Sequence, residues 1–421
     1  MLVGQNDPPR DTEADVAIVG FGPVGATAAL ALARAGLRVT VLEEAGAEAA
    51  EREDLSESRA STFHPPTLEI LDDLGVADEL HEAGLVADTY QYRDRADGLV
   101  AHFDLACLKD DTRFPYRLQS EQRNLVRIIG RRLAGVPNVR LVHGARVTSI
   151  DPGDAVGDAP GSGATGSRAT VTVDGGARFR ARWVIAADGA HSTVRRGLGI
   201  AFPGITYPER FLVVSTTDDF AELLPGIGAV NYISDPREWL VLLRTPLHWR
   251  ALFPIPESEA DGGALEPAAI QRRLQGVAPL DRGYAIAHAR IYRVHQRIAE
   301  RFRDGRVLLA GDAAHINNPL GGLGMNSGIH DAAAAAAAIV AAERGDPGPA
   351  GAYAKARRDV AHGYVRAVTH ENWESLQEED PEERRRQADH MRRTAADPAL
   401  ARAHLLRSSM LAAGEPERAA G

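Results

Sequence analysis

A glycine-rich motif near the start of the chain has the residue types and spacing that bind a dinucleotide. The motif is GFGPVG at positions 20–25, and Glu43 follows at the end of the next apolar run. The first glycine permits a tight turn, the second lets backbone N–H groups approach a pyrophosphate, and the third allows close packing of helix on strand. An acidic side chain after the second strand accepts hydrogen bonds from ribose hydroxyls. Gly20, Gly22, Gly25 and Glu43 therefore predict a dinucleotide site, without distinguishing FAD from NAD.

Two aspartates follow later apolar runs of the chain and add to this chemistry. Asp188 lies in RWVIAADGAHS (182–192), and Asp312 lies in GRVLLAGDAAH (305–315). Each run predicts a buried strand that delivers a carboxylate at the edge of the sheet where ligands bind in open α/β folds. Each aspartate taken singly is equally compatible with a turn that bonds its own backbone. Together with the glycine motif, they predict three nucleotide contacts on one sheet.

The composition argues against several other chemistries. Cys107 is the single cysteine of 421 residues, so an internal disulfide is impossible, and no CxxC or HExxH cluster predicts a metal site. A formal net charge of −10 argues against nucleic acid as a partner. The apolar runs are too short to span a membrane, and the N-terminal residues lack the pattern of a signal peptide, which predicts a cytoplasmic protein. Redox chemistry is therefore expected from a bound cofactor.

The elements that must position these residues alternate between strands and helices. Apolar, β-branched runs at 15–20 and 37–43 flank an alanine-rich stretch at 24–35. This pattern predicts a β-α-β unit with parallel strands. One or two short helices are predicted within 66–84, and an amphipathic helix is predicted over 120–135. The chain is therefore expected to open with a parallel α/β sheet.

Later segments predict a second sheet and a helical end. The aperiodic segment 151–167 predicts a long hairpin loop whose flanking strands pair. Successive strand-like runs over 205–260 predict an antiparallel sheet. An alanine-rich helix over 331–343 follows the return of the α/β pattern at 306, so the second domain is expected to be inserted into the first. The segment 351–411 predicts helices with a solvated, charged face.

The three motifs, in this order, resemble those of the class A flavoprotein monooxygenases with the para-hydroxybenzoate hydroxylase fold. The resemblance covers residues from about 14 to 360 and implies FAD as the cofactor. It also implies that Asp312 holds the ribityl chain and that Asp188 serves both FAD and a transient NADPH or NADH. Arg59 and Gln119 resemble the family's arginine and glutamine that clasp the flavin diphosphate and ribityl region. The residues that the resemblance assigns to the cofactor are Gly20, Gly22, Pro23, Val24, Gly25, Glu43, Glu44, Arg59, Gln119, Asp188, Asp312, Pro319, Gly322, Gly324, Met325 and Asn326.

The loop HINNPLGGLGMN (315–326) resembles the family's loop beneath the flavin ring. The resemblance implies that Pro319 lies near the reacting carbon and that a helix N-terminus points at the pyrimidine end of the flavin. Reduced flavin is anionic, so free N–H groups and a helix dipole favour it. Asn318 departs from the family, where many members have a proline. Turn formation accounts for Asn317 and Asn318 slightly better than a catalytic role does.

Tyr232, in YISDPR (232–237), resembles a family tyrosine that hydrogen-bonds a phenolic substrate. Deprotonating a phenol makes its ring a better nucleophile, so such a contact would assist hydroxylation. Leu243 lies where a benzoate-binding member would offer a hydroxyl, which argues against a small benzoate. Arg244 beside it is expected to be a surface residue of a strand, although it could meet an anion.

His64 follows Arg59 in a segment that the family runs close to flavin and substrate. A histidine at this place could take a phenolic proton near neutral pH. The alternative is a packed residue before Pro65, which the sequence favours. Tyr232, His64 and Pro319 are the candidate catalytic residues.

The expected fold is α/β, with a Rossmann-like FAD/NAD(P)-binding domain, an inserted mixed or antiparallel β-sheet domain for the substrate, and C-terminal helices. The expected ranges are 1–13 for a disordered tail, 14–90, 118–200 and 285–345 for the discontinuous FAD-binding domain, 91–117 and 201–284 for the substrate domain, and 346–421 for the helical segment.

The resemblance implies an FAD-dependent, NADPH- or NADH-consuming monooxygenase. Dioxygen would form a flavin C4a-hydroperoxide that hydroxylates a small, activated aromatic molecule, either phenol-like or heteroaromatic. Alternatives are an epoxidase, a Baeyer–Villiger enzyme, a halogenase, a reductase or a non-catalytic FAD-binding sensor. WRALFPIP (249–256) departs from the halogenase pattern WxWxIP, and neither Lys109 nor Lys355 stands where a halogenase lysine would. A monomer or homodimer is expected.

Overall fold

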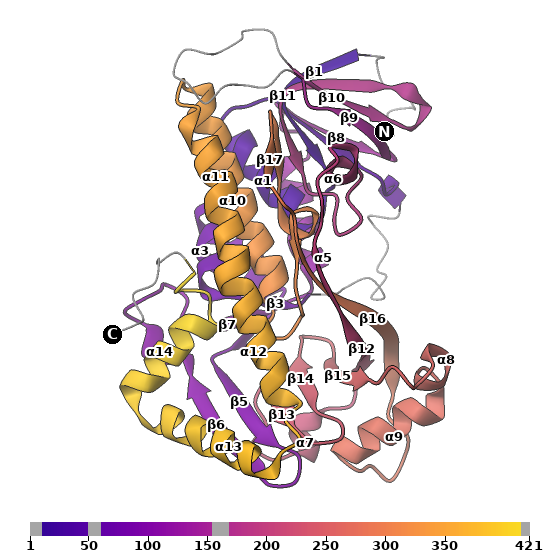
Figure 1. Cartoon of the computed structure of the whole chain (residues 1–421), viewed down its shortest axis with the longest axis vertical. Helices are drawn as coiled ribbons and strands as arrows, with labels where there is room; N and C mark the ends of the chain where they lie inside the picture. Colours follow the sequence, from indigo (N-terminus) through magenta and orange to yellow (C-terminus); the bar gives the residue numbers. More distant parts are fainter. Residues whose placement is uncertain (1–10, 49–59, 154–167, 414–421) are drawn as a thin grey trace.

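Two eight-stranded sheets lie toward opposite ends of the long axis of the molecule (Figure 1). The structure is a computed structural model that describes residues 11–48, 60–153 and 168–413. The first sheet has the order β17-β18-β11-β1-β2-β8, with β10 attached to β11 and β9 attached to β10. Its strands are β1 (Asp11–Val19), β2 (Val39–Glu43), β8 (Val139–His143), β9 (Val147–Asp151), β10 (Ala169–Val173), β11 (Arg178–Ala186), β17 (Arg303–Asp304) and β18 (Val307–Leu309).

The first sheet is built around the predicted β-α-β unit. β1 pairs in parallel with both β2 and β11, so that Val16 lies opposite Val39 on one side and Trp183 on the other. Helices α1 (Pro23–Arg34), α5 (Gln122–Leu133) and α10 (Leu323–Glu343) share one buried apolar core with these strands. β-branched side chains suit strands that are buried on both faces, which explains the apolar runs. The predicted parallel sheet is confirmed.

The predicted hairpin is also confirmed, because β9 and β10 pair antiparallel across it. Its loop residues 154–167 lie outside the described residues, as do residues 1–10 of the predicted tail and the predicted cofactor residue Arg59. Residues 11–13 differ from the prediction, because they already belong to β1, which pairs with β11 from Asp11 onward.

The second sheet has the order β19-β16-β12-β15-β14-β13-β5-β6 and is mixed, since β13 pairs with β5 in parallel and its other pairs are antiparallel. Strand β16 lies within the range 285–345 predicted for the FAD-binding domain, yet it pairs with β12 in this second sheet. The strands are β5 (Thr89–Asp94), β6 (Gly98–Asp104), β12 (Gly204–Thr216), β13 (Val230–Ser234), β14 (Leu240–Arg244), β15 (Trp249–Ile255), β16 (Ile286–Ile298) and β19 (His315–Ile316). Helices α8 (Asp261–Ala264) and α9 (Pro267–Val277) lie beside it.

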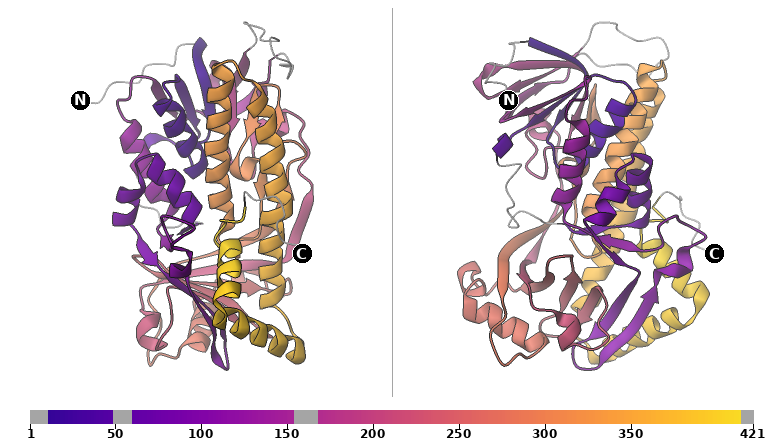
Figure 2. Two further views of the ribbon diagram at one scale, coloured as in Figure 1. Left: turned by 90° about the vertical axis from the view of Figure 1, so that its left-hand side faces the viewer. Right: turned by 180° about the vertical axis from the view of Figure 1, so that it is seen from behind.

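Helices near the C-terminus connect the two ends of the molecule. Figure 2 shows α10 beside α11 (Gly348–Val360), and α12 (Arg366–Leu376) continues from α11 toward the second sheet. A short π-helical turn, Ala361–Val365, joins α11 to α12. Helix α13 (Pro381–Ala396) packs on β6, and α14 (Pro398–Ser408) packs against the turn that follows β6. The predicted α/β fold with C-terminal helices is confirmed.

A small three-stranded sheet lies between the two large sheets (Figure 1). β7 (Arg117–Gln119) pairs antiparallel with β3 (Thr62–Phe63) and β4 (Leu85–Ala87). Helices α3 (Pro65–Asp73) and α4 (Ala77–Glu82) follow β3, as the sequence predicts. Among the described residues, no helix is long and apolar enough to cross a membrane.

Candidate cofactor and substrate site

A cavity of about 540 Å³ lies where the three sequence motifs meet the second sheet. One side of it is formed by the glycine motif, the turn of Asp188 and Gly189 (the Asp-Gly turn), the turn of Gly311 and Asp312 (the Gly-Asp turn) and the loop before α10 (residues 317–322). Apolar residues of the second sheet form the opposite side. The residues used below that line this cavity are Gly22, Pro23, Val24, Thr62, Arg117, Tyr232, Leu243, Asp312, Pro319, Gly321, Gly322, Gly324 and Met325.

The three glycines of the first motif have different surroundings. Gly20 has φ +94°, and a Cβ there would lie 2.4 Å from the Ala187 carbonyl oxygen. A Cβ on Gly25 would lie 2.0 Å from the Gly20 carbonyl oxygen, whereas nothing lies within 4 Å of one on Gly22. Gly20 and Gly25 are therefore required by the packing, and Gly22 borders open space. Helix α1 begins there without a side-chain cap, which leaves N–H groups for an anion.

Glu43, the last residue of β2, hydrogen-bonds the backbone of the glycine motif. Its Oε2 accepts a hydrogen bond from the Phe21 N–H at 2.6 Å, and its Oε1 accepts one from the Ala45 N–H at 2.9 Å. The predicted acid thus lies beside the motif and holds its backbone. Glu44 instead pairs with Arg146 at 3.4 Å, and both side chains are exposed.

The two motif aspartates lie in neighbouring turns. The Asp188 Oδ2 accepts a hydrogen bond from the Val194 N–H at 3.1 Å, while its buried Oδ1 has no partner among the described residues. Asp312 lies in a short 3₁₀ turn directly after β18 and lines the cavity. Arg195, which sequence reasoning missed, donates to the Ala190 and Ala313 carbonyl oxygens at 2.8 and 2.9 Å. It therefore ties the two turns together.

A second residue that sequence reasoning missed is Asp331, buried in α10. Its carboxylate accepts hydrogen bonds from the Gly311 N–H (3.0 Å), the His315 Nε2 (2.8 Å) and the Arg357 Nε (2.5 Å). Burial alone would raise the pKa of Asp331, but the charge of Arg357 and the contacts of His315 outweigh it and lower the pKa to about 2. The Asp331 cluster, defined as these four residues, fixes the turn that carries Asp312.

Gln119 presents a free donor beside the cavity. Its Oε1 accepts a hydrogen bond from the Thr62 hydroxyl at 2.9 Å, and its buried Nε2 has no partner among the described residues. Asn326 fastens the neighbouring backbone, because its Nδ2 donates to the Thr62 and Gly322 carbonyl oxygens and its Oδ1 accepts from the His64 N–H. The predicted cofactor residues Gln119 and Asn326 therefore lie close together, in different roles.

His64 is fully buried and is held against the loop before α10. Its Nε2 donates to the Gly321 carbonyl oxygen at 2.8 Å, so the other ring nitrogen carries no proton in the neutral form. Burial, followed by the charge of Arg117, lowers the pKa of His64 well below its usual range. These contacts favour the packed interpretation over that of a base.

The loop before α10 bends through two glycines with positive φ, Gly321 at +106° and Gly322 at +70°. The Asn318 Oδ1 accepts a hydrogen bond from the Leu320 N–H at 3.0 Å, which is the turn that the sequence favours for this residue. Pro319 is exposed to the cavity at the tip of this loop. Helix α10 begins at Leu323 without a side-chain cap, so its free N–H groups face the same region.

The wall from the second sheet is apolar apart from Tyr232 and Arg290. Tyr232, on β13, stacks on Tyr92 with ring centroids 5.4 Å apart. Leu243 lines the cavity from β14, whereas Arg244 pairs with Asp219 at 3.1 Å and does not line it. This wall can hold an aromatic ring and exclude water.

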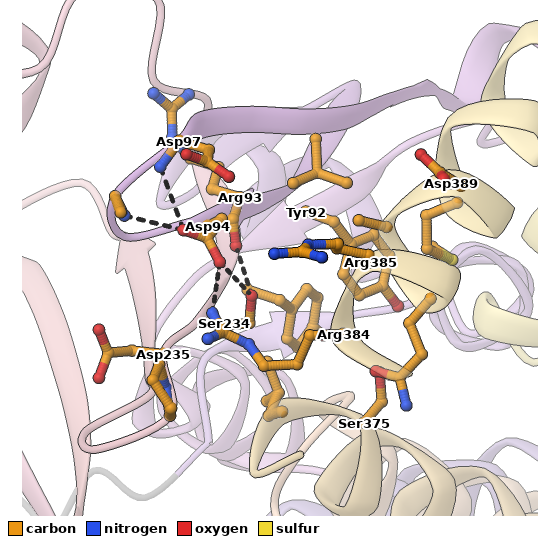
Figure 3. A pocket seen from close by; sticks show the side chains of 18 of the residues that line it. Tyr92, Arg93, Asp94, Asp97, Ser234, Asp235, Ser375, Arg384, Arg385 and Asp389 are labelled. Atoms are coloured by element: carbon orange, nitrogen blue, oxygen red, sulfur yellow. Dashed lines mark hydrogen bonds and ion pairs between the residues drawn. The ribbon is translucent and has the colours of Figure 1, made fainter. Parts of the chain in front are cut away.

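Tyr232 also borders a second cavity of about 740 Å³, between β5, β13 and α13 (Figure 3). This cavity is polar: Figure 3 shows Asp94 facing Ser234 and Arg384, and the Asp94–Arg384 ion pair measures 2.5 Å. None of the three motifs lines it, so the smaller cavity is the candidate active site.

The comparisons with known proteins extend over nearly the whole chain. A family model described as an FAD binding domain matches residues 13–368. The para-nitrophenol 4-monooxygenase of Pseudomonas sp. (strain WBC-3) is 35% identical over 403 residues, which cover 93% of this chain and 94% of that protein. The 6-hydroxy-3-succinoylpyridine 3-monooxygenase of Pseudomonas putida is 35% identical over 329 residues, 75% of this chain and 77% of that protein. The crystal structure of a p-nitrophenol 4-monooxygenase from Pseudomonas putida matches with a TM-score of 0.86 at 31% identity and covers 97% of this chain and 100% of that chain.

Proposed function

Because the chain belongs to the FAD-dependent aromatic monooxygenases, we propose that it uses NADPH or NADH and dioxygen to hydroxylate a small phenol-like molecule. The observation that carries this proposal is the cavity itself. One side presents the three nucleotide motifs, and the other presents a mostly apolar wall that includes Tyr232 and Arg290. In this proposal the first sheet serves the cofactor and the second sheet serves the substrate.

The residues present fit FAD. The space over Gly22 would admit the diphosphate, and the unpartnered Gln119 Nε2 is a buried donor that needs an acceptor. Asp312 would hold the ribityl chain from its turn. FAD would supply the redox chemistry, namely acceptance of a hydride and activation of dioxygen.

The protein's own residues would bind and orient the reactants. The N-terminus of α10 would place N–H groups where negative charge gathers on a reduced flavin. Tyr232 would hydrogen-bond the substrate hydroxyl, and Leu243 with its apolar neighbours would keep water away from the ring. Pro319 would contact the flavin from the loop tip, and His64 would position that loop through the Gly321 carbonyl oxygen. A cytoplasmic location and a monomeric or homodimeric state stay predictions.

The test is aerobic oxidation of NADPH and of NADH by the FAD-loaded protein, with 4-nitrophenol, other phenols and hydroxypyridines. We expect one compound class to accelerate oxidation and to yield a product that contains one added oxygen atom from dioxygen. Peroxide is measured in the same vessel. Tight FAD binding without accelerated oxidation by any of these compounds, or with peroxide as the sole product, would contradict the proposal.

A further inference from the structure

Arg117, on β7, is a buried cation whose charge the described residues leave uncompensated. Its side chain lies in the interior, with 2% of the residue exposed. Its Nη2 donates to the Ser408 carbonyl oxygen at 3.3 Å, but its Nε and Nη1 have no hydrogen-bond partner among the described residues. No carboxylate of the described chain forms an ion pair with it. A buried cation without a counter-charge is costly, so this arrangement points to a ligand.

The groups around Arg117 add no negative charge. Its guanidinium lies over the Tyr90 ring, 4.3 Å from the centroid. The Tyr90 hydroxyl is 2.6 Å from the His404 Nε2, and burial raises the pKa of Tyr90, so it stays protonated. Burial, followed by the charges of Arg117 and Arg407, lowers the pKa of His404 to about 4, so His404 is neutral near pH 7. The surroundings are therefore uncharged apart from arginine.

Arg407, the other arginine beside this pocket, is compensated. Its guanidinium pairs with Glu371 through two contacts of 2.6 and 2.8 Å. A small pocket of about 40 Å³ separates these arginines, lined also by Tyr92, Tyr232 and Gly321. The unpaired charge of this region is thus that of Arg117.

Arg117 reaches the candidate active site as well as the small pocket. Arg117, Tyr232 and Gly321 line both spaces, so Arg117 lies where the two spaces adjoin. Gln119 lies two residues further along β7, and alternate residues of a strand share one face. An aromatic ring held between the loop before α10 and the apolar wall would therefore present a substituent to Arg117.

We propose that Arg117 recognises an oxygen of the aromatic substrate that carries full or partial negative charge, either a phenolate oxygen or a nitro oxygen. This inference rests on the proposed function and specifies its substrate class. The two free donors, Nε and Nη1, lie on different edges of the guanidinium, so each can donate a separate charge-assisted hydrogen bond to an oxygen of a ligand. An arene with neither of these groups would leave the donors of Arg117 without an acceptor, so the site selects against it.

The test measures dissociation constants of aromatic ligands with the FAD-loaded protein and its Arg117→Met and Arg117→Lys variants. The ligands are 4-nitrophenol, 4-nitroanisole, which lacks the ionisable hydroxyl, 4-chlorophenol, which lacks the nitro group, and 4-chloroanisole, which lacks both. Loss of a charge-assisted hydrogen bond predicts about 10- to 100-fold weaker binding of 4-nitrophenol to Arg117→Met. Arg117→Lys is expected to retain part of the affinity for 4-nitrophenol. The dissociation constant of 4-chloroanisole is expected to be the same for all three proteins. The matched control Arg407→Gln, whose partner is Glu371, is expected to change affinity less than about threefold.

The two intermediate ligands identify the oxygen that Arg117 contacts. If the affinity falls only for the ligands with a nitro group, Arg117 contacts the nitro group. If it falls only for the phenols, Arg117 contacts the phenolate oxygen. Equal weakening of all four ligands, or unchanged affinities with a shifted reduction potential of the bound flavin, would overturn the proposal. If the unaltered protein neither binds nor oxidises these aromatics, the proposed function itself fails. If the unaltered protein hydroxylates these aromatics and Arg117→Met binds them with the same affinity, the inference about Arg117 alone fails.

Discussion

Two arginines of this molecule, the buried Arg117 and the partly buried Arg357, have opposite surroundings. Arg357 lies in the Asp331 cluster, where its Nε donates to a fully buried carboxylate at 2.5 Å and its Nη2 donates to Ser327. Arg117 lies beside the substrate cavity and meets an aromatic ring and one carbonyl oxygen. The first charge is compensated by the protein, and the second is not.

This difference indicates what each region is for. The Asp331 cluster connects α10, α11 and the turn of Gly311 and Asp312, so its interactions hold the backbone that carries candidate cofactor residues. The Arg117 pocket keeps two donors free, at a cost to stability that binding of an oxyanion would offset. A compensated buried charge thus serves the fold, whereas an uncompensated one at a cavity serves a ligand.

The largest effect on stability is expected from Asp331→Asn, which removes the negative charge that compensates Arg357. The substitution leaves the partly buried Arg357 without its carboxylate, and breaking such a pair costs about 3–5 kcal/mol. The measurement is chemical denaturation of the FAD-loaded protein, with FAD release recorded in parallel. Asp359→Asn is the matched control, because Asp359 pairs with Lys355 at the surface, and no measurable change is expected there. Equal stability of the two variants would contradict the assignment.

Acid should weaken the same cluster in a defined pH range. The pKa of Asp331 is about 2 in the folded chain, against an ordinary value of 3.8. A carboxyl whose pKa is lowered by folding stabilises the fold fully above its ordinary pKa, and that contribution is lost as the pH falls from about 4 towards 2. The loss amounts to on the order of 2 kcal/mol. The readout is the difference in unfolding free energy between the parent chain and Asp331→Asn, which should narrow over this range. A difference independent of pH would refute the role of Asp331.

The sequence predicted the parts of the site that lie within local motifs. The turn at Gly20, the acid at Glu43 and the aspartates after two strands follow from residue type, spacing and the edge of a parallel sheet. The parallel sheet and the hairpin between β9 and β10 also follow from local pattern. These features needed no knowledge of which distant segments pack together.

Contacts between distant segments were beyond sequence reasoning. Asp331 lies in an alanine-rich helix, and its role depends on meeting Gly311 and Arg357 in space. Arg117 stands two residues before Gln119, but its missing partner becomes visible only when α14 brings Ser408 and His404 beside β7. The range 285–345 predicted for the FAD-binding domain includes β16, because the residue pattern of this strand does not indicate that it pairs with β12.

The smallest effect is expected from Arg117→Met when stability alone is measured. Removing an uncompensated buried charge and filling its place with an apolar side chain is often neutral or stabilising by about 1 kcal/mol or more. The free energy of unfolding of the FAD-loaded protein, measured without an aromatic ligand, should therefore stay equal or rise. Arg357→Met is the matched control, because the same substitution there leaves the Asp331 carboxylate short of its charged partner and should lower stability by about 3 kcal/mol. If both substitutions destabilise the chain alike, Arg117 is an ordinary structural residue. If Arg117→Met is neutral or stabilising while it weakens 4-nitrophenol binding, the charge is retained for the ligand.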